Sequence, residues 1–499
     1  MNCPPTHRVF VLALSLGPAA LAACSDPFGF APEAEEVEVC ATSAEWLPVT
    51  PAMAAFKPLP HPATECPFYR GGWQNFLIAT QPDENGVPAI VDYPTIDTMF
   101  QPAQELPANR SYLGDIKQAG GRQILIDQNG NSLYYGIHAN QGFADFVNLN
   151  GLETRAGIEG ADPLLFFPEG VVEFKSAWQV IEPGMSTDDY ITMTTTVPRL
   201  SQDPDTKLIH EDRNTPREVD VRLLALHVVF TLPGHPEFVW STFEHSDGTP
   251  DGRAEDGKRN VAPNLDLNPD PIKDPLNLQN DTIVSDKPHE LYAPGTPANA
   301  ANQAIGEEDL VLDETAQKFT GQSTSIYRMF PASKSNTIDP DDAITSLNLN
   351  TEALFAQAEA AGTLDPVDKR GHYRLVGAVW MDKPAYFLGN SPLQNDPSSP
   401  FADEPGFDDA IAADGSDSDF SILAGEDRLS STAMESFTQS PGAFPNCFTC
   451  HNTQAVTARG VPFARDPDGV KLLDDKFINV SHVLSQFLLE EREREALAP

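Results

Sequence analysis

The chain has 499 residues, of which 40% are hydrophobic, and its formal net charge at pH 7 is −41. A chain of this length is expected to form more than one domain, and its apolar fraction is high enough for hydrophobic cores. The negative charge excludes nucleic acid as a main partner, because contacts with phosphate need clustered lysine and arginine.

The N-terminus predicts export from the cytoplasm. Residues 1–23 combine Arg8 with an apolar run, Val9–Leu16, that is too short to span a bilayer. The segment ends in Leu-Ala-Ala before Cys24, which resembles the lipobox of bacterial lipoproteins. This resemblance implies that the signal is cut before Cys24, that its thiol carries a lipid, and that Ser25 directs the protein to the outer membrane. The alternative is an ordinary signal peptide that leaves Cys24 as a free thiol.

Residues 24–65 are expected to form a flexible, lipidated tether that one disulfide constrains. The segment is rich in proline and acidic residues and shows no periodicity. Of the six cysteines, one is lost with the signal, one is the expected lipid site and two belong to a motif near the C-terminus. This leaves Cys40 and Cys66, which an oxidising compartment predicts to be paired. Two unpaired thiols are the alternative.

Residues 66–400 are predicted to form a β-rich body that begins with helices. Hydrophobic spacing predicts an amphipathic helix within Phe68–Thr80 and a weaker helix over Ile96–Gln104. An Asn-Gly pair predicts a hairpin between Arg122–Asp127 and Ser132–Ile137. Further strands are expected where branched and aromatic residues accumulate, at Val171–Ile181, Tyr190–Val197, Val219–Leu232, Phe238–Glu244 and Arg374–Met381.

The composition changes after residue 400. Asp and Ser dominate at first, and the chain closes with a helical pattern over Ile478–Leu489. Between them lies Cys447-Phe448-Thr449-Cys450-His451, a C-x-x-C-H motif. We therefore treat residues 401–499 as one segment that carries this motif and is mainly helical.

The spacing of the C-x-x-C-H motif has a mechanical reason. Two thiols about one helical turn apart reach the two vinyl groups of a porphyrin, and the adjacent histidine then directs its imidazole at the iron. The motif predicts one covalent haem c, held by Cys447 and Cys450 with His451 as the proximal iron ligand. The alternatives are a disulfide and a zinc half-site, and zinc would need further ligands.

The sixth iron ligand has two candidates. No methionine follows His451, but His482 does, at the start of the last predicted helix. Ligation by His482 would give a bis-histidine haem, which has a lower potential than a histidine–methionine haem. Met434, upstream of the motif, is the competing ligand, and local packing of His482 is the alternative to ligation.

Three histidines of the body, His227, His235 and His245, lie near one another in the sequence together with Glu244. Such residues could bind a metal, but their spacings fit no familiar metal pattern, and strands in different registers would scatter the side chains. We interpret them as polar residues at strand ends and turns. A role in a pocket near the haem remains the alternative.

Several segments together resemble a group of exported bacterial cytochrome c family proteins. They are FYRGGWQNFL, EFKSAWQVI, HPEFVWSTFEH, PNCFTCHN and INVSH, scattered between about residues 66 and 487. The resemblance implies covalent haem at Cys447, Cys450 and His451. It implies no substrate.

The sequence thus predicts an α+β protein, with a β-rich body and a C-terminal, mainly helical c-type haem-binding segment. The expected function is electron transfer to or from a partner protein at the cell envelope, in the periplasm or on the outer membrane, with a lipid anchor. One alternative is a haem enzyme, of peroxidase or oxygenase type, with an open sixth iron position. Another is a binding lipoprotein in which the haem is structural.

Overall fold

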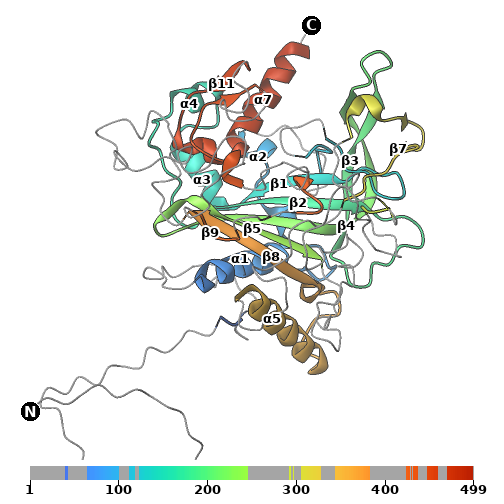
Figure 1. Ribbon diagram of the computed structural model, residues 1–499, viewed down its shortest axis with the longest axis vertical. Coiled ribbons are helices and arrows are strands. Elements are labelled where there is room, and N and C mark those ends of the chain that lie inside the picture. The colour runs from blue at the N-terminus through green and yellow to red at the C-terminus, as the bar shows by residue number, and fades with distance from the viewer. Residues whose placement is uncertain are drawn as a thin grey trace, which may run out of the picture. The chain divides into compact units, whose positions relative to one another are not determined.

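One seven-stranded sheet organises the body of the protein, and every strand pair in it is antiparallel (Figure 1). The strand order is β1-β2-β4-β5-β8-β9, and β3 pairs with β4 outside this path. The strands are β1 (Tyr134–Ala139), β2 (Val172–Val180), β3 (Thr192–Gln202), β4 (Ile209–Leu232), β5 (His235–His245), β8 (Tyr373–Met381) and β9 (Leu423–Gly425).

The computed structural model describes a defined set of residues, all within the unit Cys40–Pro499. They are residues 40–42, 46, 65–100, 112–118, 123–245, 291–293, 296, 305–326, 343–381, 423–426, 429, 431–436, 447–458 and 469–497. The predicted export signal, the lipid site at Cys24 and most of the predicted tether lie outside this set.

The strand predictions for the body are confirmed by β2, β3, β4, β5 and β8. The main difference is that β4 begins at Ile209, ten positions before the predicted Val219. This polar first half pairs with β3 alone, from Gln202↔Ile209 onward. A ribbon that is exposed to solvent carries no apolar alternation, so the sequence pattern shows only the second half of β4, which is buried.

The predicted hairpin is confirmed at its turn, and its two arms pair through the isolated antiparallel bridge Ile126↔Ser132. The backbone N–H of Asp127 donates to the carbonyl of Asn131 over 2.8 Å, and Gly130 adopts a positive φ of 84°. The first arm forms isolated bridges. The second arm continues into β1, which pairs with β2 in the register Tyr134↔Trp178.

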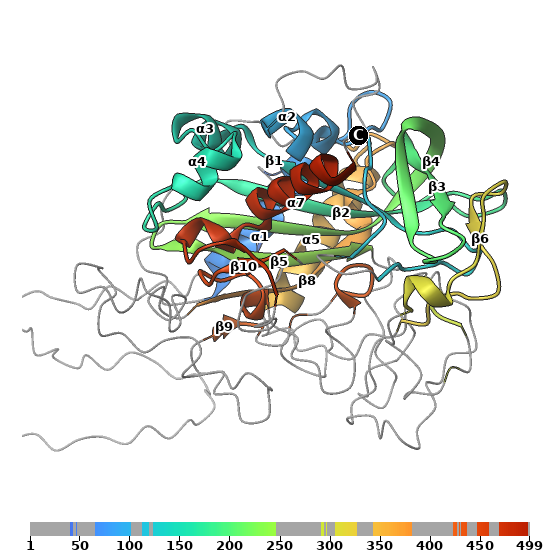
Figure 2. The ribbon, with the colours of Figure 1, turned by 90° about the horizontal axis from the view of Figure 1, so that it is seen from above.

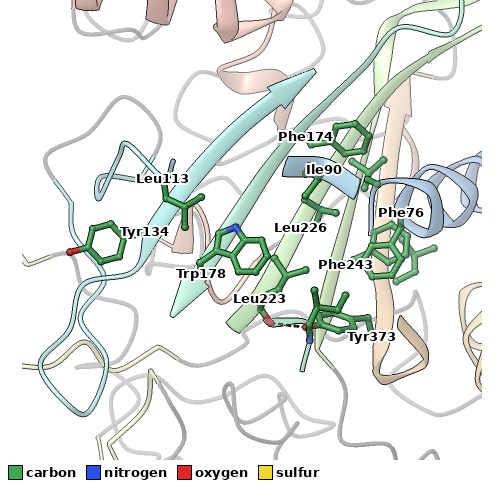
Figure 3. Close-up of a cluster of buried hydrophobic side chains, with 14 of the residues drawn as sticks. Phe76, Ile90, Leu113, Tyr134, Phe174, Trp178, Leu223, Leu226, Phe243 and Tyr373 are labelled. Carbon is green, nitrogen blue, oxygen red and sulfur yellow. Dashed lines mark hydrogen bonds between the residues drawn. The ribbon is translucent and has the colours of Figure 1, made fainter. Parts of the chain in front are cut away.

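Two helices cover one face of the sheet (Figure 1). They are α1 (Cys66–Ala79), which confirms the predicted amphipathic helix, and α5 (Ala343–Ala360); the short 3-10 helix η3 (Ala89–Asp92) packs beside them. Phe76 of α1 stacks on Phe243 of β5 with ring centroids 4.5 Å apart, and Figure 3 shows this core with Ile90 of η3.

A disulfide joins Cys40 to Cys66 at the start of α1, with the Cα atoms 5.4 Å apart. Just along the helix, a Cβ atom built at Gly72 would lie 3.1 Å from the Ser241 hydroxyl oxygen. The absence of a side chain at Gly72 therefore lets α1 approach β5 closely.

The opposite face of the sheet carries the C-terminal elements. Figure 2 looks onto this face and shows α7 lying across the strands. The elements here are α2 (Ile96–Phe100), α3 (Gln141–Leu149), α4 (Arg155–Gly160), η10 (Cys447–Thr449), β10 (Val456–Thr457), β11 (Lys471–Leu473), η12 (Phe477–Val480) and α7 (His482–Leu497). Four further short elements are η5 (Glu307–Asp309), β6 (Leu312–Asp313), β7 (Lys318–Phe319) and η6 (Arg370–His372).

The prediction of a mainly helical C-terminal segment is wrong. In the described part of residues 401–499, α7 is the single α-helix, and it stands beside two 3-10 turns and three short strands. β9 extends the body sheet by pairing with β8, and the β-branched pair Val456-Thr457 forms a two-stranded ribbon with β11. The apolar spacing over Ile478–Leu489 predicted one helix that includes residues of η12. In the structure Ser481 is extended and separates η12 from α7.

The described C-terminal segment and the body share one hydrophobic core, to which both contribute large apolar side chains. Among the described helices, none has the length and apolar character needed to cross a bilayer.

Candidate functional site

The C-x-x-C-H motif forms one tight turn on the face of the sheet that carries α7. The backbone N–H groups of Cys450 and His451 both donate to the carbonyl of Cys447, over 3.1 and 2.9 Å. Phe448 is fully buried and fixes the turn in the hydrophobic core. The side chain of Asn452 donates to the Phe448 carbonyl over 3.0 Å. Both thiols and the imidazole thus project from a single anchored turn.

The imidazole of His451 packs against two rings and is held at one nitrogen. Its ring centroid lies 4.0 Å from that of Trp240 on β5 and 3.8 Å from that of His482. Its Nδ1 lies 3.0 Å from the carbonyl oxygen of Val480. A carbonyl can only accept, so Nδ1 carries the proton and Nε2 keeps its lone pair. Desolvation, reinforced by His482, lowers the pKa of His451 well below its usual value, which keeps the ring neutral.

The chain around Val480 is itself fixed at several points. The Asn479 side chain donates to the carbonyls of Gln454 and Asp474 over 2.9 and 2.8 Å, so it joins the two halves of the C-terminal segment. The hydroxyl of Ser481 donates to a carboxylate oxygen of Glu173 on β2 over 2.5 Å. Burial raises the pKa of Glu173 to about 7, although the hydrogen bond from Ser481 opposes this shift.

The two motif cysteines carry thiols and form no disulfide. Burial, with smaller effects from the charges of Glu435 and Cys450, raises the pKa of Cys447 to about 12. A thiol with so high a pKa stays protonated at neutral pH as long as no metal binds it.

A charged cluster lies on the sheet beside this turn. Lys175, His227 and Thr242 stand in one row across β2, β4 and β5, because Lys175 pairs with His227 and His227 pairs with Thr242. The Glu435 carboxylate binds both basic groups: one oxygen contacts Lys175 Nζ, and the other lies 2.8 Å from His227 Nε2. The Thr242 hydroxyl lies 2.9 Å from His227 Nδ1.

The charges in this cluster are fixed by their partners. Burial alone would raise the pKa of Glu435, but Lys175 and His227 together hold it well below its usual range. The carboxylate is thus an anion that only accepts, so His227 donates to it from Nε2. Glu435 also has a φ of +47°, a left-handed conformation that is costly for a residue other than glycine.

The segment 431–436 brings Glu435 to the sheet. Its first residues bind a carboxylate of β5, since the Thr432 backbone N–H donates to Glu244 over 2.9 Å. The Tyr135 hydroxyl donates to the Ala433 carbonyl over 3.0 Å, and the Ser436 backbone N–H donates to the Gln118 side chain over 2.8 Å. The segment is therefore anchored at both ends and in its middle.

The structure separates the three histidines of the body. His227 belongs to the charged cluster. His235 lies 2.8 Å from Glu237, and His245 stacks on Tyr190 with centroids 3.7 Å apart. Glu244 binds the segment 431–436. Over the part of the chain that the structure describes, no three His, Cys, Asp or Glu side chains gather as a metal site.

The two candidates for the sixth ligand lie in different surroundings. His482 begins α7 and stacks on His451, and its Nε2 lies 3.1 Å from the carbonyl oxygen of Cys450. Met434 is fully buried in the segment 431–436, in a small hydrophobic cluster that includes Tyr135.

Sequence reasoning missed Glu173, Lys175, Glu435 and Trp240 as residues of this site. One signal was present for the first two. Val172–Val180 reads VEFKSAWQV, in which two charged residues alternate with apolar ones on a strand whose neighbours are buried. Charges at every second position of a buried strand indicate a polar site on one face of the sheet.

No family model, no curated protein and no solved structure matches this chain. The function of the site therefore has to be inferred from its residues and their geometry.

Proposed function

We propose that this protein is an exported c-type cytochrome that carries a single covalent haem and transfers electrons at the cell envelope. The observation that carries this proposal is the donor set on one turn: two thiols that form no disulfide, followed directly by a neutral imidazole. Its Nδ1 is occupied by the Val480 carbonyl, which leaves the Nε2 lone pair of His451 for a metal.

The residues of the turn fit haem c residue by residue. The S–H bonds of Cys447 and Cys450 would each add across a vinyl group, which forms two thioethers without loss of atoms. His451 would supply the proximal nitrogen, while Trp240 and the Val480 carbonyl keep its ring in place. When bound, the haem supplies an iron that alternates between the ferric and ferrous states.

For the sixth position we propose His482, with Met434 as the alternative. His482 is the imidazole nearest to His451 in the described residues, and it starts a helix that is packed into the core. Coordination through its Nε2 would require the hydrogen bond with the Cys450 carbonyl to open.

The proposed location rests on the sequence of the N-terminus. We propose that a lipid on Cys24 anchors the protein in the envelope, in the periplasm or on the outer membrane. The net charge of −41 favours a redox partner with a basic docking surface, because complementary charge accelerates encounter.

A second candidate function is a haem enzyme of peroxidase or oxygenase type. The observation that favours it is the His227–Glu435 pair, whose nitrogen–oxygen distance is 2.8 Å, next to the motif turn. The Glu435 side chain is 23% exposed, and a histidine oriented by a carboxylate is a common general acid or base. A simple electron carrier has no need of such a pair, whereas an enzyme with an open iron position does.

The test is to express the protein with a c-type maturation system and extract it with acid–acetone. We expect haem to remain on the wild-type chain and on a Cys40→Ser control, and to be lost by extraction from a Cys447→Ser/Cys450→Ser variant. A wild-type chain that loses its haem would contradict the proposal. A low-spin ferric spectrum supports electron transfer, whereas a high-spin spectrum with ready binding of cyanide supports the enzyme.

A further inference from the structure

A short series of contacts connects the central sheet with the imidazole of His451. Glu173 on β2 accepts the hydrogen bond of the Ser481 hydroxyl, over 2.5 Å. Ser481 directly follows Val480, whose carbonyl lies 3.0 Å from His451 Nδ1. The position of that carbonyl therefore depends on a contact made by the next residue of the chain.

This contact is made at the point where the backbone changes direction. Ser481 is extended, with φ −92° and ψ 118°, between η12 and α7. Its side chain is fully buried, and that of Glu173 is 7% exposed. A buried carboxylate costs free energy, so an apolar residue here would give a more stable strand. The cost indicates that the contact with Ser481 has a use beyond packing.

We propose that Glu173 is a positioning residue for His451. It holds Ser481 against the sheet and thereby places the Val480 carbonyl where it fixes the tautomer and the orientation of the imidazole. This inference rests on the proposed function, in which His451 binds iron through Nε2. A carbonyl that accepts from Nδ1 increases the donor strength of Nε2, which stabilises the ferric state and lowers the reduction potential.

A merely structural role for Glu173 makes a different prediction. In that case a variant would lose stability, but the proton on His451 Nδ1 and the reduction potential would stay unchanged. Two readouts separate the roles: the exchange rate of the Nδ1 proton, measured by 15N NMR of labelled histidine, and the midpoint potential of the holoprotein.

The experiment compares Glu173→Ala, Glu173→Gln and Ser481→Ala in the holoprotein. Glutamine keeps an oxygen that can accept from Ser481, so we expect it to retain both wild-type values. Alanine at either position removes the contact, so we expect the Nδ1 proton to exchange about tenfold faster and the potential to rise. Glu307→Ala is the matched control, because Glu307 is also buried and accepts from the Ile209 backbone N–H over 2.6 Å.

Unchanged exchange and an unchanged potential in both alanine variants would overturn the inference while leaving the haem proposal intact. Ser481→Ala keeps the experiment decisive if Glu173→Ala does not fold, because it removes only a hydroxyl. If the wild-type chain carries no haem, the proposed function fails instead. The exchange rate in the haem-free protein then still decides whether Glu173 positions the His451 ring.

Discussion

The imidazole rings of His451 and His482 are stacked, with centroids 3.8 Å apart and an interplanar angle of 26°. To hold the iron together with His451, His482 would have to leave this stack. It would also lose its hydrogen bond with the Cys450 carbonyl, whose net value is about 1 kcal/mol.

Replacing His482 by alanine tests this ligation. We expect the ferric iron of the variant to change from low spin to high spin, because an axial nitrogen is lost. The measurement is the optical spectrum of the ferric holoprotein, with Met434→Leu as the matched control that should leave it low-spin. The opposite pattern, in which only the Met434 variant changes, would assign the sixth position to Met434.

Glu435 is predicted to lower the reduction potential of the site. Its carboxylate is ionised and close enough to Cys447 to raise the pKa of that thiol. A nearby anion stabilises ferric over ferrous iron, so Glu435→Gln should raise the midpoint potential. An interaction on the order of 1 kcal/mol corresponds to about 40 mV for a one-electron couple.

Lys175, the cation of the same cluster, provides the control for Glu435→Gln. Lys175→Met removes the opposite charge and should lower the potential, and the double variant should return it towards the wild-type value. If both single variants shift the potential in the same direction, a change of structure and not of charge is responsible, and the electrostatic prediction fails.

The sequence predicted those parts of the fold that are buried. The branched and aromatic residues of β2 and β5 and the apolar spacing of α1 follow directly from burial, and the structure confirms these elements. The exposed first half of β4 was not predicted, since pairing with a single neighbour leaves no apolar pattern. The helical content of the C-terminal segment was overestimated, since two short strands there hold too few residues to show a period.

The candidate site was predictable only where a local motif marks it. Cys447, Cys450 and His451 are adjacent in sequence, so their spacing reveals them. Lys175 and Glu435 lie 260 positions apart, and only the register of the sheet and the anchored segment 431–436 bring them together. A single sequence contains no record of such a pairing.

The disulfide between Cys40 and Cys66 should contribute measurably to stability. It closes a loop with a sequence separation of 26, for which the chain-entropy model gives about 3.5 kcal/mol. We expect Cys40→Ser, or reduction of the wild-type protein, to lower the free energy of unfolding by about this amount in a denaturant titration. Cys24→Ser is the control, and its midpoint should not change. Equal midpoints for Cys40→Ser and the wild type would show that the bond adds no stability.

Glu173 should make the stability of the protein depend on pH. Burial raises its pKa from 4.5 to about 7 in the folded state, so the folded protein holds a proton that the unfolded chain releases. Its contribution to stability is complete below pH 4.5 and is lost as the pH rises through 7. The shift corresponds to about 3 kcal/mol in total.

Glu173→Gln removes this titration, because the amide stays neutral at every pH. As the pH rises from 4.5 to above 7, the wild type should lose the contribution of Glu173, whereas the variant should not. We therefore expect the variant to become more stable relative to the wild type over this range. Chemical denaturation at a series of pH values measures this difference, in which the titration of distant groups cancels. Ser481→Ala adds a second check. The hydrogen bond from Ser481 opposes the rise in the pKa of Glu173, so its loss should raise that pKa further. The pH range over which the contribution of Glu173 to stability is lost should then move to higher pH. A difference that is flat across this range would mean that Glu173 is ionised in the folded protein and has an ordinary pKa.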